Sequence, residues 1–324
     1  TNSGALTIAA AGDMTLDGAF LQDGAGAVST AGDITTTNDA IQYDGAVTLT
    51  GNTTLDTGAG AGTITFSSTL DATSAGTETL SLTAGTGNVV LTGAVGGTTR
   101  LGDLTIVSAA DVTAAAVTAS TITQTAGSGT TTFNGALNTN AAGGVDLNGT
   151  AFAINSTVTT TTGGTVTITN AGALTIAAAA DMTLDGAFLQ DGAGAVSTAG
   201  DITTTNDNIQ FDGAVTLTGN TALDTGAGAG TITFSSTLDA TSAGTETLSL
   251  TAGTGNVVLT GAVGGTTRLG DLTIVSAADV TAAAVTASTL TQTAGSGTTT
   301  FNGALNTNAA GGVDLNGTAF AINN

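Results

Sequence analysis

Residues 1–156 return almost unchanged as residues 169–324, and this long repeat limits the possible fold more than any other feature. Thr1 aligns with Thr169, and the alignment continues to the end of the chain without a gap. A chain that repeats itself in this way is built from similar structural units stacked on one another. The sequence therefore predicts one continuous repetitive architecture, with a first unit at 1–168 and a second, incomplete copy at 169–324. We expect it to be a window on a longer array. The seven positions that differ are Ser3/Ala171, Gly12/Ala180, Ala40/Asn208, Tyr43/Phe211, Thr54/Ala222, Ile122/Leu290 and Ser156/Asn324.

Short runs that alternate apolar residues with threonine or another small residue predict β-strands within each unit. This period of two is typical of strands with one buried face. Asp-Gly, Gly-Asn and Asn-Gly pairs separate the runs and favour turns. The AAAV run at 114–117 has no helix caps, so we interpret it as strand and loop. The clearest runs are LTI at 6–8, VTL at 47–49, ITF at 64–66, LSL at 80–82, LTI at 104–106, FAI at 152–154 and VTI at 166–168.

A finer period indicates how these strands are arranged. Apolar residues recur about every 21 residues along the row Leu6, Val28, Leu49, Leu70, Leu91, Val112, Phe133, Ile154 and Leu174. Roughly 20–30 residues is the size of one coil of a solenoid. Because a short strand cannot stand alone, we expect coils of two or three strands stacked at ~4.8 Å. The predicted fold is all-β: a parallel β-helix, or β-solenoid, with coils of about 21 residues and no helices.

The composition excludes most catalytic chemistry. The chain has no histidine, cysteine or proline, and its only cations, Arg100 and Arg268, face 24 acidic residues, which gives a net charge of −22. Without histidine and lysine, the commonest general base and the Schiff-base amine are missing, and thiolate chemistry is excluded too. Nucleic acid is excluded as a partner because two cations cannot neutralise a phosphate backbone. No apolar run approaches the ~20 residues of a membrane span.

Two segments carry a resemblance to a known group of proteins. GALTIAAAGDMTLDG at 4–18 and TITFSSTLDATSAGTETLSLTAGTGNVVLTGAVGGTT at 63–99 are similar to the β-solenoid regions of large bacterial surface proteins. That group includes filamentous-haemagglutinin-like adhesins and autotransporter passengers. The resemblance implies export to the extracellular space or the cell surface. It also implies a right-handed β-helix and a rod that holds a surface away from the cell.

The aspartates are the first candidates for a binding site. Calcium prefers several hard oxygens, but the tandem G-G-x-G-x-D repeats of a calcium-binding β-helix are missing. We interpret these aspartates as turn residues in Asx turns on a solvated face. No catalytic, cofactor-binding or metal-binding residue is predicted, although weak bridging by divalent cations between neighbouring rods stays open. Asp13, Asp33 and Asp103 each follow a glycine, and Asp17, Asp23 and Asp44 each precede one.

Three further features of the sequence bear on function. Two carboxylates are the minimum for glycoside hydrolysis, but one tyrosine and nine phenylalanines offer few aromatic platforms for sugars. Threonine pairs at 48–50, 63–65, 121–123 and 165–167 would suit an ice-binding face, but their spacing places them in different files. Arg100 precedes Asp103 by three positions, which suggests a local ion pair that contributes ~0–1 kcal/mol. Arg268 and Asp271 repeat that pattern.

These features together predict a structural protein rather than an enzyme. We expect part of an extracellular filament or adhesin stalk, which serves surface extension, matrix assembly or adhesion. The expected partner is the chain itself, through end-to-end continuation of the array. The alternative is a carbohydrate- or surface-binding module that uses an exposed face of the solenoid.

Overall fold

The computed structural model describes residues 1–323, which fold entirely into short β-strands and connecting turns, with no helix among them. Contacts divide the chain into two compact units, Thr1–Thr161 and the residues from Thr162 onward. Each unit is a parallel β-solenoid whose coils contribute three strands each, except that one coil of each unit has only an isolated bridge, at Val95 or Val263, in place of its first-column strand. The predicted all-β solenoid without helices is therefore confirmed.

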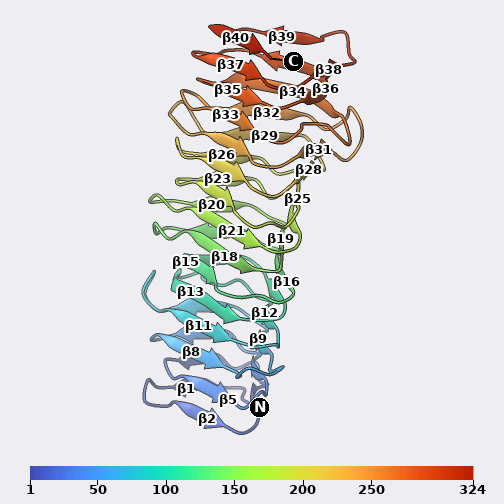
Figure 1. The fold of residues 1–324 in the computed structure, drawn as a ribbon. Helices are drawn as coiled ribbons and strands as arrows, with labels where there is room; N and C mark the ends of the chain where they lie inside the picture. The colour runs from blue at the N-terminus through green and yellow to red at the C-terminus, as the bar shows by residue number, and fades with distance from the viewer. Residues whose placement is uncertain (324) are drawn as a thin grey trace. The chain divides into compact units, whose positions relative to one another are not determined.

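Strands of the first unit stack in three columns, and Figure 1 shows the second-column strands β8, β11 and β13 one above the next. The first column contains β1 (Leu6–Ile8), β4 (Val28–Thr30), β7 (Val47–Leu49), β10 (Leu70–Ala72), the start of β15 (Val117–Gln124), β17 (Leu137–Thr139) and β20 (Val158–Thr160). The second contains β2 (Met14–Leu16), β5 (Ile34–Thr36), β8 (Thr53–Asp56), β11 (Leu80–Thr83), β13 (Leu101–Ser108), β15 and β18 (Val145–Gly149). The third contains β3 (Phe20–Gln22), β6 (Ile41–Tyr43), β9 (Ile64–Phe66), β12 (Val89–Leu91), β14 (Val112–Ala114), β16 (Thr130–Phe133) and β19 (Ala151–Ile154).

The second unit also stacks its strands in three columns, which are numbered here by the sequence equivalence of their strands to those of the first unit. The first contains β22 (Leu174–Ile176), β25 (Val196–Thr198), β28 (Val215–Leu217), β31 (Leu238–Ala240), the start of β36 (Val285–Gln292) and β38 (Leu305–Thr307). The second contains β23 (Met182–Leu184), β26 (Ile202–Thr204), β29 (Thr221–Asp224), β32 (Leu248–Thr251), β34 (Leu269–Ser276), β36 and β39 (Val313–Leu315). The third contains β21 (Val166–Asn170), β24 (Phe188–Gln190), β27 (Ile209–Phe211), β30 (Ile232–Phe234), β33 (Val257–Leu259), β35 (Val280–Ala282), β37 (Thr298–Phe301) and β40 (Ala319–Ile322).

Coil length varies because the turns between strands differ in length. A short coil carries the chain from Leu104 to its partner Ile122, and a much longer one carries it from Thr53 to Leu80. The average coil has about 22 residues, so the long sequence repeat is not a whole number of coils. The regular row of apolar residues expected from the sequence is wrong as a single file. Val28 pairs with Val47 rather than Leu49, and Leu91 lies in the third column.

The core is a thin layer inside each coil, formed by the inward residues of the short strands. In β9, Ile64 and Phe66 are buried while Thr65 lies on the outer side. Successive side chains of a strand point to opposite faces, so an apolar–Thr–apolar run places its threonine outside. All the runs expected to be strands are strands, and Ala114 and Val117 of the AAAV run end β14 and begin β15.

Glycines fill the corner that leads from the third column to the first, where successive turns nearly touch. A Cβ on Gly194 would lie 1.7 Å from the carbonyl oxygen of Gly172. A Cβ on Gly213 would lie 2.2 Å from the carbonyl oxygen of Gly194. No side chain fits at these distances, so the D-G-A-G-A sequence is needed for the backbones to stack. We call this the glycine corner.

Candidate functional site

The described coils offer neither a cavity nor a metal centre. No pocket forms over residues 1–323, and no three acidic side chains there gather closely enough to hold a metal ion. The same residues form no helix long and apolar enough to cross a bilayer. Their notable chemistry lies instead in polar side chains at the corners, between one coil and the next.

Gln190 forms the most completely bonded of these clusters, at the glycine corner of the second unit. Its side chain is fully buried, and Nε2 donates hydrogen bonds to Asn170 Oδ1 (2.7 Å) and the Gly192 carbonyl (2.6 Å). Its Oε1 accepts from the backbone N–H groups of Asp212 (3.1 Å) and Gly213 (2.9 Å). Both amide protons and the oxygen are therefore used to join three successive coils, and none is left for a ligand.

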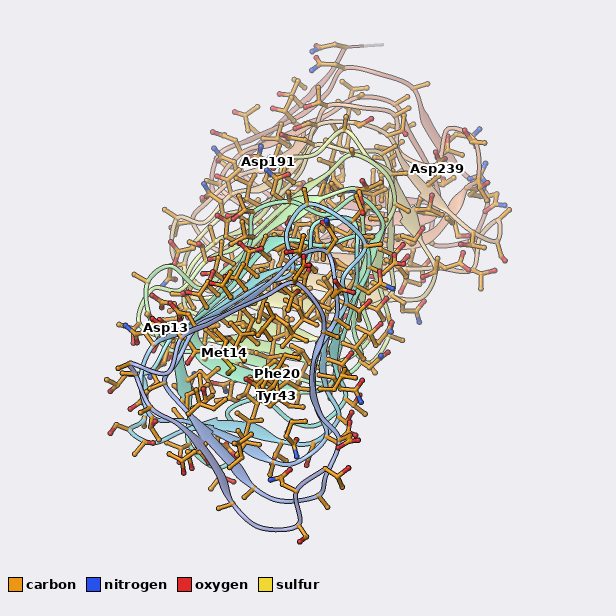
Figure 2. The ribbon with its side chains drawn as sticks, turned by 90° about the horizontal axis from the view of Figure 1, so that it is seen from below. Asp13, Met14, Phe20, Tyr43, Asp191 and Asp239 are labelled. Carbon is orange, nitrogen blue, oxygen red and sulfur yellow. The ribbon has the colours of Figure 1, made fainter. Side chains whose placement is uncertain are left out.

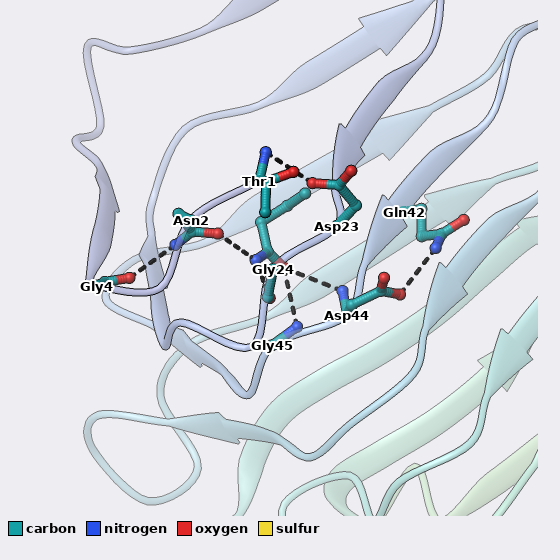
Figure 3. Close-up of polar contacts among 9 residues, drawn as sticks. Thr1, Asn2, Gly4, Asp23, Gly24, Gln42, Asp44 and Gly45 are labelled. Atoms are coloured by element: carbon teal, nitrogen blue, oxygen red, sulfur yellow. Dashed lines mark hydrogen bonds and ion pairs between the residues drawn. The ribbon is translucent and has the colours of Figure 1, made fainter.

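Gln22 repeats this cluster in the first unit, where its partners Asn2, Gly24, Asp44 and Gly45 are labelled in Figure 3. Nε2 donates to Asn2 Oδ1 at 2.5 Å and to the Gly24 carbonyl. Oε1 accepts from the N–H groups of Asp44 (3.0 Å) and Gly45 (2.9 Å). Neither glutamine is among the residues predicted from the sequence. The signal was a glutamine at the inward position of the FLQ strand, followed directly by Asp-Gly.

Aspartates extend the glutamine clusters outward. Asp44 Oδ1 accepts from Gln42 Nε2 (2.8 Å) and from Ser67 Oγ in the next coil (2.8 Å). Asp23, on the solvent side of the same corner, pairs with the amino group of Thr1 at 2.7 Å (Figure 3). Hydrogen bonding and attraction to that amino group lower the pKa of the Asp23 carboxyl. Both carboxylates therefore bind groups of the protein itself.

Arg100 joins coils along the stack. Its Nη1 donates to the carbonyls of Ala119 (2.5 Å) and Asn138 (2.9 Å), and Nη2 donates to Asn138 Oδ1. Partial burial lowers the pKa of Arg100. Arg268 repeats the arrangement with Ala287 (2.6 Å) and Asn306 (2.9 Å). Each arginine therefore bridges to two following coils.

The local ion pair suggested for Arg100 and Asp103 does not form. Asp103 instead accepts a hydrogen bond from Thr121 Oγ1 at 2.7 Å, and Asp271 accepts one from Thr289 at the same distance. The physical reason is reach: the long arginine side chain extends along the stack to backbone carbonyls. The carboxylate stands on its own strand, opposite a threonine of the next strand.

Most of the aspartates and asparagines at corners also bond across coils, which corrects the interpretation that Asx turns explain every placement. Asp13 Oδ1 accepts the N–H of Asp33 (2.9 Å), and Asp33 Oδ1 accepts the N–H of Thr54 (2.7 Å). Only a position such as Asp56, which accepts the N–H of Gly58 (2.7 Å), forms the local turn. Asp17 is exposed in the turn between β2 and β3. These side chains supply an acceptor wherever a turn leaves a backbone N–H without a strand partner.

Aromatic side chains lie almost entirely inside the coils. Figure 2 shows Phe20 and Tyr43 in the interior of the first unit, and the Tyr43 ring stacks on Phe66 at 5.2 Å. Tyr43 is fully buried, and its hydroxyl lies near Thr30 without a hydrogen-bond partner. This burial raises the pKa of Tyr43 above its usual range. Eight of the ten aromatic residues are buried, Phe20 is half-buried, and Phe320 is 41 % exposed, so no exposed aromatic platform forms among the described residues.

The threonine pairs do not gather on one face. The pair at 48–50 lies at β7 of the first column, the pair at 63–65 lies at β9 of the third, and the pair at 121–123 lies in β15 of the second. The pair at 165–167 belongs to β21, in the third column of the second unit. The expectation that the four pairs do not stack in one file is confirmed.

The fold and its polar corners define a parallel β-solenoid whose side chains are used to hold coil on coil. No family model, no curated protein and no solved structure matches this chain. Its function is therefore inferred from the geometry and chemistry of the coils themselves.

Proposed function

We propose that this chain is a structural module, a repetitive stretch of an extracellular filament or adhesin stalk. The observation that carries the proposal is how the polar groups are used. Gln190, Arg100 and Asp33 all bond to the backbone of neighbouring coils. A chain that uses its polar groups in this way ties each coil to its neighbours, and no pocket forms within the described residues.

The resemblance to bacterial surface proteins supports placing the module outside the cell, in a large filamentous-haemagglutinin-like or autotransporter-type protein. A near-identical repeat serves extension better than a unique binding cleft does, because each copy adds the same length of chain. We propose no intrinsic enzymatic activity. Turnover of a polysaccharide by the pure chain, abolished by a single Asp→Asn substitution, would contradict this.

The proposed partner is the same array, joined end to end, with weak lateral association that depends on divalent cations. A net charge of −22 makes copies repel side by side unless salt or divalent ions screen them. Electron microscopy and light scattering with and without a chelator test both parts. We expect end-to-end assemblies in both conditions and bundles only with divalent ions. Dispersed single chains at high concentration, or bundles that persist in chelator, would contradict the proposal.

One observation favours the alternative, a module that binds a carbohydrate or another surface through an exposed face. In both units the outward central positions of the third-column strands carry no charged residue, although the chain as a whole is strongly acidic. In the first unit these positions are Leu21, Gln42, Thr65, Val90, Thr113, Thr132 and Ala153. Glycan-array binding lost on Val90→Asp, and kept on Thr48→Asp in the first column, would establish this function.

A further inference from the structure

Arg100 is the only cationic side chain of the first unit, and it has no counterion. The one ion pair within residues 1–323 joins the Thr1 amino group to Asp23. Asp103, three positions after Arg100, bonds to a threonine instead. Arg268 takes the equivalent place in the second unit. Over the part of the chain that the structure describes, 24 acidic residues thus leave both guanidinium charges without a carboxylate partner.

The guanidinium of Arg100 uses only some of its N–H groups inside the solenoid. Nη1 donates to the carbonyls of Ala119 (2.5 Å) and Asn138 (2.9 Å), and Nη2 donates to Asn138 Oδ1. A guanidinium is planar, so the remaining N–H of Nη2 and the N–H of Nε lie side by side and point the same way. Neither of them makes a hydrogen bond within residues 1–323. We call this pair of donors the free arginine fork.

The free arginine fork is open to solvent. Arg100 as a whole is only partly buried, and its Nε is not one of the buried side-chain atoms that lack a partner within residues 1–323. Partial burial still removes some of the water around the cation, which lowers the pKa of Arg100. A carboxylate at the fork would supply two acceptors and the missing counter-charge together.

The surface around the fork is polar and nearly neutral, although the chain as a whole is strongly acidic. The first-column strands that follow Arg100 present Thr118, Asn138 and Thr159 outward. Asp71 is the only acidic residue among the outward central positions of the first-column strands in this unit. Its Oδ1 already accepts two backbone N–H groups of the loop before Arg100, at 2.8 and 3.0 Å. Hydroxyl and amide groups of this kind can bond to the hydroxyls of a sugar.

We propose that the free arginine fork binds the carboxylate of a uronic acid unit in a glycan whose other sugars are neutral. Nε and Nη2 each donate to one carboxylate oxygen, which is the two-point geometry that guanidinium and carboxylate groups favour. A net charge of −22 repels a phosphate dianion more strongly than a single carboxylate. The same charge on a second copy of the chain opposes its approach, so a lightly charged glycan is the favoured ligand.

This site goes beyond the structural function, because it allows the side of a coil to hold an acidic glycan while the stacking of coils continues. Arg268 offers the same fork in the second unit. Its Nη1 donates to Ala287 (2.6 Å) and Asn306 (2.9 Å), and its Nη2 donates to Asn306 Oδ1 (2.9 Å). The chain therefore contains a second, equivalent site that serves as an internal reference.

The Nε–H signals of the two arginines in a proton–nitrogen NMR spectrum of the whole chain test the proposal, because no other guanidinium is present. The probe is methyl glucuronoside, and the matched neutral control is methyl glucoside. We expect the glucuronoside to shift both Nε–H signals saturably at millimolar concentration, and the glucoside to leave them unchanged. The carboxylate accounts for the difference, since the two sugars are otherwise alike.

Two variants locate the site. Arg100→Lys keeps the charge and loses the fork, so binding at the first unit should weaken by roughly tenfold or more while the Arg268 signal still shifts. Asn138→Asp keeps the Oδ1 acceptor and gives Arg100 a counter-charge, so it should also weaken binding there without removing any N–H group. Unchanged backbone amide signals around Thr118 show that each variant keeps its fold.

The outcomes decide between the glycan and other occupants of the fork. A saturable shift with the glucuronoside, lost at the first unit in Arg100→Lys, supports the proposal. The absence of a shift overturns it, and so does an equal shift with methyl glucoside or a shift with inorganic phosphate alone. Nε–H signals that move with the concentration of the chain itself would overturn it too, because a carboxylate of a second copy would then fill the fork.

Discussion

The segment Val145–Ile154 and its copy Val313–Ile322 have identical sequences and opposite surroundings. Phe152 is 2 % exposed in the first unit, and Phe320 is 41 % exposed in the second. Nothing local distinguishes them, since both form a strand, a turn and a strand. Burial in this fold is therefore supplied by the adjacent coils, as expected where each repeat contacts only its neighbours.

A glycine substitution should show most strongly how far each coil depends on its neighbours. Gly194→Ala places a Cβ 1.7 Å from the Gly172 carbonyl oxygen, so the corner must open and the Gln190 hydrogen bonds are strained. We expect a loss of roughly 3 kcal/mol or more, at the upper end for overpacking. Denaturant unfolding followed by circular dichroism measures it.

The first unit supplies the matched control for that substitution. Gly18→Ala meets nothing within 4 Å and should change stability by less than about 0.5 kcal/mol. Gly26→Ala, the copy of Gly194→Ala, approaches Gly4, which is exposed in the first coil and free to shift. We expect an intermediate loss there. Equal losses at Gly18 and Gly194 would show that contact between coils does not set the cost.

Phenylalanine truncation compares the two copies directly. Phe152→Ala removes a buried ring and should cost about 3–5 kcal/mol, whereas Phe320→Ala should cost less than about 1 kcal/mol. Local hydrogen exchange in the second-column strands β18 and β39 is the suitable measurement, because repeat arrays need not unfold in one step. Similar losses in the two copies would mean that Phe320 is buried in solution.

Much of the fold could be predicted because its signals are local. Apolar–Thr–apolar runs such as ITF at 64–66 give the strands, and Asp-Gly pairs give the corners. The coil register could not be predicted, since turns of different length make the coils unequal. For the same reason the partners of Asp13 and Arg100, which lie one or two coils away, could not be found from spacing. Only the register decides which backbone group faces a given side chain.

Tyr43 offers a third comparison, because the second copy has Phe211 at that position and stacks it on Phe234 at the same 5.2 Å. Tyr43→Phe removes a buried hydroxyl that has no partner and should stabilise the first unit by about 1 kcal/mol. The advantage of Tyr43→Phe over the wild type should grow at alkaline pH. Burial raises the folded-state pKa of Tyr43, so the wild type keeps its full free energy of unfolding below the unfolded pKa of 10.0. That free energy falls as the pH rises above 10.0, because the unfolded chain then loses the phenol proton more readily than the folded chain.

The difference between the wild type and Tyr43→Phe isolates Tyr43, because the chain has no lysine, cysteine or second tyrosine and both chains share the Thr1 amino group and the two arginines. At pH 11 the wild type should have lost about 1.4 kcal/mol relative to pH 9, and the Tyr43→Phe chain almost none. Denaturation midpoints at the two pH values measure this. A phenolate absorbance that appears near pH 10 in the folded chain would contradict the buried position of Tyr43.

The smallest expected effect comes from Ala40, whose copy is Asn208. Asn208 Oδ1 accepts the N–H of Thr231 at 2.8 Å, whereas Ala40 offers no such acceptor to the equivalent Thr63. Ala40→Asn should therefore stabilise the first unit by about 0.5–1 kcal/mol, the net value of one hydrogen bond.

The reverse change, Asn208→Ala, should destabilise the second unit by a similar amount, and Asn208→Asp should not, because a carboxylate oxygen also accepts the N–H. Hydrogen exchange at Thr63 and Thr231 measures each site separately. If Ala40→Asn leaves exchange at Thr63 unchanged, then the corner side chains do not carry coil-to-coil bonding. The contacts between coils would then depend on packing alone, as at Gly194 and Phe152.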